Sequence, residues 1–236
     1  YQSGNLDMKF DPFHGFPQDA YAPFFGDLFF HWLLAPVGTD VLCRFGQLPF
    51  LLASGLVLYN LLRALDVSGS SARVVAAAIV LSRPLFPQQI VLNNVDLIFL
   101  YFGLAVVDEL LRLRQTGQKD ALVLVGVAFG LFVGCKLIGL VYAPVLLAAI
   151  ALLCPARVGG ARRPLALAAL VLLVVAVGGY TYLKNLAWTG NPVYPADFKL
   201  FGLLLARARF DPPVYDSEWS KLSLLEVLVG DYDFSW

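Results

Sequence analysis

At Asn93-Asn94-Val95-Asp96 the sequence sets a carboxylate and two amides between two strongly apolar runs, residues 74–82 and 97–107. Such polar groups are costly to place within a membrane, and where they occur they usually face a protein interior or a wet cavity. The stretch therefore predicts a turn between two membrane-spanning helices, with Asp96 as a candidate functional residue.

The chain as a whole is unusually apolar. Its 236 residues are 59% hydrophobic and 14% charged, with a mean hydropathy of +0.72. An ordinary soluble domain is about 45–50% apolar and about 25% charged. The net charge is +0, and no basic stripe suggests nucleic acid as a partner. The composition predicts an integral membrane protein.

Apolar runs recur along residues 41–183 and predict an all-α, polytopic transmembrane helix bundle. The expected spans or partial spans cover residues 41–62, 72–82, 95–113, 121–134, 137–153 and 165–183. The first is close to the ~20 residues that cross a bilayer. Pro84 and Pro87 bend or interrupt the second, and Lys136 separates the fourth from the fifth. Four glycines would let helices approach closely in this region: Gly126, Gly130, Gly134 and Gly139.

Two polar, aromatic segments flank the bundle. In residues 1–40, the stretch 22–34 predicts an amphipathic helix with Asp27 and His31 one turn apart on the same face. Aromatic-rich segments of this kind suit the membrane–water interface. Residues 184–236 are turn-rich, with a short helix predicted at 222–229. The expected organisation is one membrane domain, with loop 1–40, bundle 41–183 and outer segment 184–236.

The charges predict an orientation. Alternating spans place three short loops on one side, residues 63–73, 112–120 and 155–164, and these loops with their edges hold eight Lys and Arg against four acids. Positive residues in short loops mark the cytoplasmic side. The other side receives residues 93–96, Lys136, both flanking segments and thirteen of the seventeen carboxylates.

The non-cytoplasmic face gathers the candidate site residues. They are Asp27, His31, Arg83, Asn93, Asn94, Asp96, Lys136, Lys184 and Asn185. A carboxylate can take a proton from an acceptor hydroxyl, and Lys or Arg can hold the phosphate of a lipid-linked leaving group. This pattern is typical of an enzyme that uses a lipid-phosphate sugar, with the lipid tail held by the spans.

Each of these residues also has a structural explanation. Asp96 can cap the following helix, Lys136 can snorkel from a helix end, and Asp27 can be a solvated loop acid. His31 can be structural, and Arg83 can meet lipid head groups. The aromatic segment can be only an interfacial belt.

The remaining chemistry-bearing residues are few. Three scattered cysteines, Cys43, Cys135 and Cys154, form no CxxC pair, and there are two histidines. This argues against a disulfide framework or a zinc site. Paired aspartates serve metal-dependent and metal-free enzymes alike, so nothing in the sequence indicates a metal or another cofactor.

Three segments together resemble a known family pattern. They are Phe16-Pro17-Gln18-Asp19-Ala20-Tyr21-Ala22-Pro23-Phe24-Phe25-Gly26-Asp27-Leu28 with Trp32, then Asn93-Asn94-Val95-Asp96, then Lys184-Asn185-Leu186-Ala187-Trp188-Thr189-Gly190-Asn191-Pro192-Val193-Tyr194-Pro195. The chain resembles the bacterial GT-C glycosyltransferases, the polytopic group related to protein O-mannosyltransferases and the lipid A aminoarabinose transferase.

This resemblance implies sugar transfer from a polyprenyl-phosphate donor on the periplasmic face of the bacterial inner membrane, with membrane lipids around a multi-pass protein. Asp96 matches the second acidic position of the family, Asp27 lies where the family often has Glu or Asp, and Lys136 matches a basic position associated with donor phosphate. The two acids are thus the catalytic candidates. The substrate-binding candidates are Lys136, Asn93, Asn94, His31, Arg83, Lys184, Asn185, Asn191 and Tyr194.

The resemblance also implies that a first span and its acid precede Tyr1 and that further spans follow Trp236. The alternative is a non-enzymatic polytopic carrier or exporter of lipid-linked saccharide. Such a protein is expected to place polar residues deep within several spans, whereas here they gather at one end.

Overall fold

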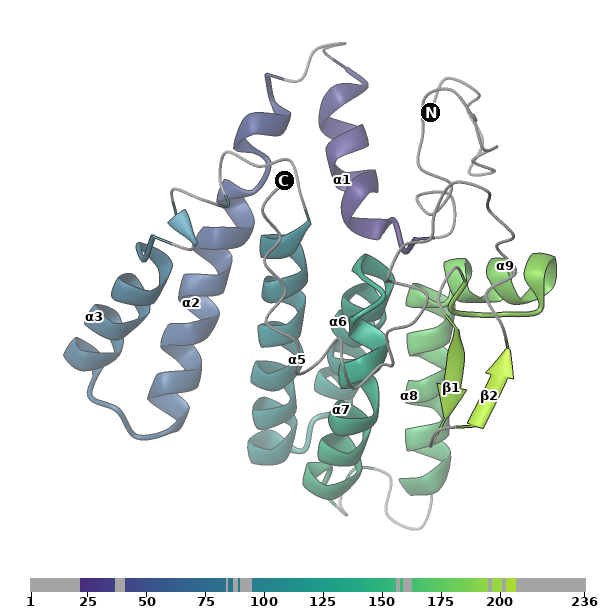
Figure 1. Cartoon of the computed structure of the whole chain (residues 1–236). Helices are drawn as coiled ribbons and strands as arrows, with labels where there is room; N and C mark the ends of the chain where they lie inside the picture. The colour runs from purple at the N-terminus through teal and green to yellow at the C-terminus, as the bar shows by residue number, and fades with distance from the viewer. Residues whose placement is uncertain are drawn as a thin grey trace. The chain divides into compact units, whose positions relative to one another are not determined.

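The computed structural model describes residues 22–36, 41–83, 85–86, 89, 95–155, 158, 163–194, 197–200 and 203–206. Within these ranges the chain forms eight α-helices, one 3-10 turn and one two-stranded hairpin (Figure 1). It divides into two compact units, one of residues 23–180 and one of residues 1–22 with 181–236. The predicted all-α class is confirmed for the described residues, with the hairpin as a small addition.

The larger unit is a set of helices that run in alternate directions. Its elements are α1 (Phe25–Leu34), the 3-10 turn Cys43–Phe45, α2 (Leu48–Ala64), α3 (Gly69–Val80), α5 (Asp96–Thr116), α6 (Lys119–Cys135), α7 (Gly139–Leu153) and α8 (Arg163–Gly178). Helix α6 packs between α5 and α8, and α2 packs between α3 and α5 (Figure 1). The predicted amphipathic helix at residues 22–34 is confirmed as α1.

Local signals explain several helix ends. The Ser68 hydroxyl accepts a hydrogen bond from the Ser71 N–H at 3.3 Å and so caps the start of α3. Helix α5 ends at Gly117, whose φ of 68° is the left-handed conformation that glycine adopts without strain. Lys136 follows α6 with extended backbone angles of −147° and 146°. The predicted break at Lys136 is therefore confirmed.

Two predicted span boundaries are wrong. The α-helix expected from residue 41 begins at Leu48, because the chain first forms the 3-10 turn and Pro49 suits the first turn of a helix. The span expected at residues 165–183 is interrupted at Gly179, where α8 has ended and α9 (Tyr180–Thr189) begins. Adjacent glycines at 178 and 179 account for the break.

Within the described parts of the chain, no single helix has both the length and the apolar composition to cross a membrane alone, and only α8 and α9 together, as a bent pair, meet that criterion. The transmembrane character of the bundle stays a prediction.

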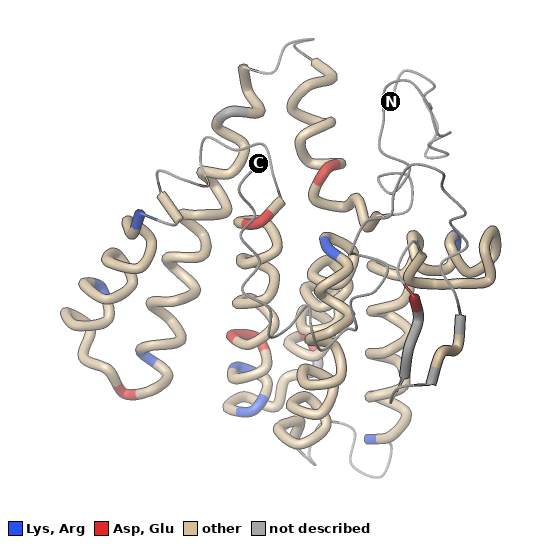
Figure 2. The backbone as a smooth tube through the Cα atoms, in the orientation of Figure 1, with Lys and Arg blue, Asp and Glu red and all other residues tan. Residues whose placement is uncertain are grey.

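Most charged residues of the larger unit lie toward the two ends of its helices, whereas Asp108 and Glu109 lie within α5 (Figure 2). Because successive helices alternate in direction, the described parts of residues 63–73, 112–120 and 155–164 lie at one end. The beginning of α5 and the end of α6 lie at the other end. Alternating spans predict this separation of the loops into two groups. Which end faces the cytoplasm stays a prediction.

The glycines predicted to allow close approach do so along α6 and α8. A methyl group at Gly126 would lie 2.7 Å from the Leu173 side chain, and one at Gly130 would lie 2.7 Å from Val177. A methyl group at Gly178 would overlap the carbonyl oxygen of Gly130. The two helices are therefore in backbone contact at this point.

We expect Gly178→Ala to destabilise the larger unit by about 1–3 kcal/mol, because the added methyl group forces the backbones of α6 and α8 apart. Thermal unfolding of the purified protein measures this. The control is Gly69→Ala, whose methyl group would lie 3.8 Å from the Tyr59 hydroxyl, an ordinary contact. Equal melting temperatures for the two variants would contradict the close packing.

The second unit contains most of α9, a turn and an antiparallel hairpin of β1 (Phe198–Leu200) and β2 (Leu203–Ala206). The sequence did not predict this hairpin. The helix expected at residues 222–229 lies outside the described residues.

Candidate functional site

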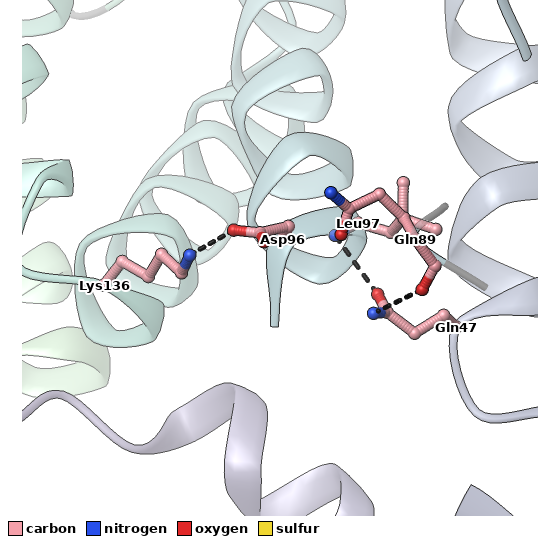
Figure 3. A network of polar contacts seen from close by, with 5 residues as sticks. All are labelled: Gln47, Gln89, Asp96, Leu97 and Lys136. Atoms are coloured by element: carbon pink, nitrogen blue, oxygen red, sulfur yellow. Dashed lines mark hydrogen bonds and ion pairs between the residues drawn. The ribbon is translucent and has the colours of Figure 1, made fainter. Parts of the chain in front are cut away.

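Asp96 and Lys136 form an ion pair in the larger unit, although 40 positions separate them in the sequence. Asp96 is the first residue of α5, and Lys136 directly follows α6. The Lys136 ammonium donates a hydrogen bond to Oδ1 of Asp96 (Figure 3). The two side chains are 36% and 35% exposed. Two residues predicted to share a face are thus brought together at a position that solvent reaches.

Each charge of the pair also suits its own helix end. A carboxylate is favoured in the first turn of α5 and a cation at the carboxyl end of α6, because of the helix dipole. An ion pair this exposed contributes about 0.2–1 kcal/mol to folding. The larger unit also has an extensive apolar core, so the pair supplies only a small part of its stability.

The first turn of α1, which carries Asp27, packs beside the helix ends that carry this pair. Asp27 itself is half-buried. The neighbouring Gly26 packs so closely on Val95 that a methyl group there would overlap the valine side chain. A methyl group at Gly134 of α6 would likewise overlap the Phe25 ring of α1, and Asp27 is one of the charges that act on the Cys135 thiol. Helix α1 therefore begins beside the start of α5 and the end of α6.

Asp27, Asp96 and Lys136 are called the carboxylate–lysine cluster below. Three helices contribute to it, and the apolar residues beneath it form one cluster of Phe30, Cys43, Val95, Ile98 and Cys135. Two acids and one amine at the end of a helical bundle can bind an anionic group at the amine and take up a proton at a carboxylate.

Sequence reasoning missed a buried amide beside the cluster. Gln47, at the N-cap of α2, is 0% exposed. Its Nε2 donates a hydrogen bond to the Gln89 carbonyl at 3.2 Å, and its Oε1 accepts one from the Leu97 N–H at 3.2 Å (Figure 3). The Leu97 N–H is a first-turn donor that has no partner within its own helix. The available signal was one of two amides, Gln47 and Asn60, within the apolar run 41–62.

The other predicted site residues of this unit are His31, Arg83, Asn93 and Asn94. His31 is half-buried in α1, one turn from Asp27 as predicted. Arg83 is exposed beyond the end of α3, and within the described residues no contact joins it to the cluster. Asn93 and Asn94 lie outside the described residues.

The predicted residues of the second unit are Lys184, Asn185, Asn191 and Tyr194, and all four are buried. The Lys184 ammonium lies 5.4 Å from the centre of the Trp188 ring, within the range of a cation–π contact.

Asn185 and Asn191 hold the turn that follows α9. The Asn185 amide donates a hydrogen bond to the Tyr194 carbonyl at 3.2 Å, and the Asn191 side-chain oxygen accepts one from the Val193 N–H at 3.0 Å. Gly190, with a φ of 73°, supplies the left-handed residue of the turn. These contacts give the Asn–Thr-Gly-Asn-Pro–Tyr segment a structural role, and its role in substrate binding stays a prediction.

The structure shows where the cysteines lie and whether acidic residues, histidines and cysteines are grouped as metal ligands. Cys43, Cys135 and Cys154 are buried and free. In the described part of the chain, no group of three or more His, Cys, Asp or Glu residues is arranged to hold a metal ion.

Comparison of the chain with protein-family models, with curated proteins and with solved structures finds no match.

Proposed function

We propose that this chain belongs to a membrane glycosyltransferase that moves a sugar from a polyprenyl-phosphate donor to an acceptor on the periplasmic face of the bacterial inner membrane. The observation that carries the proposal is the carboxylate–lysine cluster, in which Asp96 and Lys136 pair at one end of the helical unit and Asp27 lies in the adjacent first turn of α1.

In the proposed reaction, Lys136 binds the phosphate of the lipid donor. Asp96 removes the proton from an acceptor hydroxyl, and the acceptor oxygen forms a bond to the anomeric carbon as the bond from that carbon to the phosphate oxygen breaks. The polyprenyl phosphate leaves with the electron pair, and the sugar configuration inverts. Asp27 supplies a second carboxylate that stabilises positive charge on the sugar ring.

The apolar surface of the helices supports a lipid environment. Large apolar side chains on several helices are more than half exposed, which is unusual for a soluble protein. They include Leu52, Leu56, Val74, Val145, Leu152, Leu165 and Leu172. A bilayer would cover these side chains, and it would also hold the polyprenyl tail of the donor near the cluster.

One observation favours the alternative of a carrier for lipid-linked saccharide. Asp108 and Glu109 are partly buried on α5, about 18 Å along the helix from Asp96 at 1.5 Å per residue. Acids at that depth are a feature of proteins that move ions or substrates across membranes.

Vesicles carrying the full-length protein that contains this chain distinguish the two functions. A panel of polyprenyl-phosphate donors, radiolabelled in the sugar, is supplied with native membrane acceptors. Transfer predicts that the label leaves the lipid and becomes covalently bound to an acceptor, at a rate above that of vesicles without the protein. Label that crosses to the opposite leaflet while still attached to its lipid would support the carrier instead and overturn the transferase.

A further inference from the structure

The first turn of α5 is held on the side away from Lys136. Leu97 is 1% exposed and packs in an apolar cluster with Leu51 and Val80. Its N–H donates to Gln47, whose amide is in turn bonded to the Gln89 carbonyl. One buried side chain thus joins the start of α2, the segment before residue 90 and the start of α5.

This arrangement determines where Asp96 points. Asp96 immediately precedes Leu97, so the bond that holds the Leu97 N–H also sets the rotation of the first turn. In Figure 3, Gln47, Gln89 and Leu97 lie on one side of this turn and the Asp96 side chain points to Lys136 on the other. The start of a helix is otherwise prone to fray, because its first N–H groups have no helical partners.

We propose that Gln47 is a positioning residue that holds Asp96 in register with Lys136. The geometric part of this inference rests on the Gln47–Leu97 and Asp96–Lys136 contacts. A catalytic effect of Gln47 rests in addition on the proposed function. Gln47 itself is 0% exposed. It acts through the backbone of α5.

The test replaces Gln47 by methionine, which has a similar length and volume but lacks both amide contacts. The direct readout is the rate at which acetic anhydride modifies Lys136, followed by mass spectrometry relative to the other lysines of the chain. In the wild-type protein the Lys136 nitrogen is engaged by Asp96, and loss of that contact leaves it more accessible to the anhydride. We therefore expect Gln47→Met to raise the Lys136 rate about threefold or more.

A double-mutant cycle distinguishes a specific effect of Gln47 on the Asp96–Lys136 pair from a general destabilisation of the helices. In an Asp96→Asn background, Gln47→Met is expected to add nothing to the Lys136 rate, because the ion pair is already lost. The matched control is Ser54→Ala, another buried polar residue of α2 outside this network, with the wild-type rate expected. Gln47→Asn, which is one methylene too short to make both bonds, provides a second variant, with a smaller increase expected.

Transfer kinetics give the second readout. If Gln47→Met displaces Asp96 while Lys136 can still bind the donor phosphate, we expect a lower kcat and a donor KM within about twofold of wild type. A wild-type Lys136 rate, an equal rise at all lysines, or full additivity with Asp96→Asn would each overturn the positioning role. Because the labelling cycle needs no sugar transfer, it decides this inference even if the transferase proposal fails.

Discussion

Asp96→Asn is expected to lower sugar transfer more than tenfold while the protein still accumulates and folds. The amide has nearly the shape of the carboxylate, but it cannot accept the proton of the attacking hydroxyl, and positioned acid–base groups contribute about 10²–10⁴-fold to rate. Folding is spared because the Asp96–Lys136 pair is about one-third exposed and contributes little to stability. The measurement is the initial rate of label transfer in membrane vesicles, normalised to the amount of protein.

Asp66→Asn is the matched control for this substitution. Asp66 lies between α2 and α3, with a φ of 62°, and asparagine adopts that left-handed conformation readily. Transfer by the control variant should equal that of wild type. Transfer by Asp96→Asn at a near-normal rate would remove Asp96 from the catalytic role and leave it as a residue of the helix start.

Much of the helical architecture could be predicted from the sequence, because apolar runs and their interruptions carry that information. The break at Lys136 was predicted from a single cation between two apolar segments. Close helix approach was predicted from glycines alone, and the structure identifies α8 as a partner of α6 there. The beginning of α2 could not be predicted in the same way. Residues 41–47 continue the apolar run with Val41, Leu42, Cys43 and Phe45, so hydropathy alone did not separate them from the helix. The structure separates them by a 3-10 turn that packs on α1 and by Pro49 in the first turn of α2.

The candidate site was partly predictable for a related reason. Asp96 and Lys136 each interrupt apolar sequence, so both were visible, and alternation of the helices placed them at the same end. Gln47 carried little signal, because its importance depends on meeting Gln89 and Leu97 in space. Asn185 is a different case. A rare sequence pattern predicted substrate binding, which stays a prediction, and the structure adds that its hydrogen bonds hold a local turn.

Lys136→Ala is expected to raise the donor KM about tenfold or more and to lower kcat by a smaller factor. A charge-assisted contact to phosphate is worth about 1.5–3 kcal/mol, and most of that interaction is already made when the donor binds. Interactions made equally in the bound and transition states appear in KM, whereas those made only in the transition state appear in kcat. Steady-state rates over a range of donor concentrations in vesicles separate the two.

Two further variants make this result specific to the position of the charge. Lys136→Arg keeps a cation that can bind phosphate and should recover part of the donor affinity, although the guanidinium geometry differs. Lys119→Ala removes the same residue type from the opposite end of α6 and should leave the donor KM unchanged. If Lys136→Ala instead lowers kcat at an unchanged donor KM, the lysine does not bind the phosphate. The Asp96–Lys136 pair then serves to orient the carboxylate, and the donor phosphate must be bound by other residues.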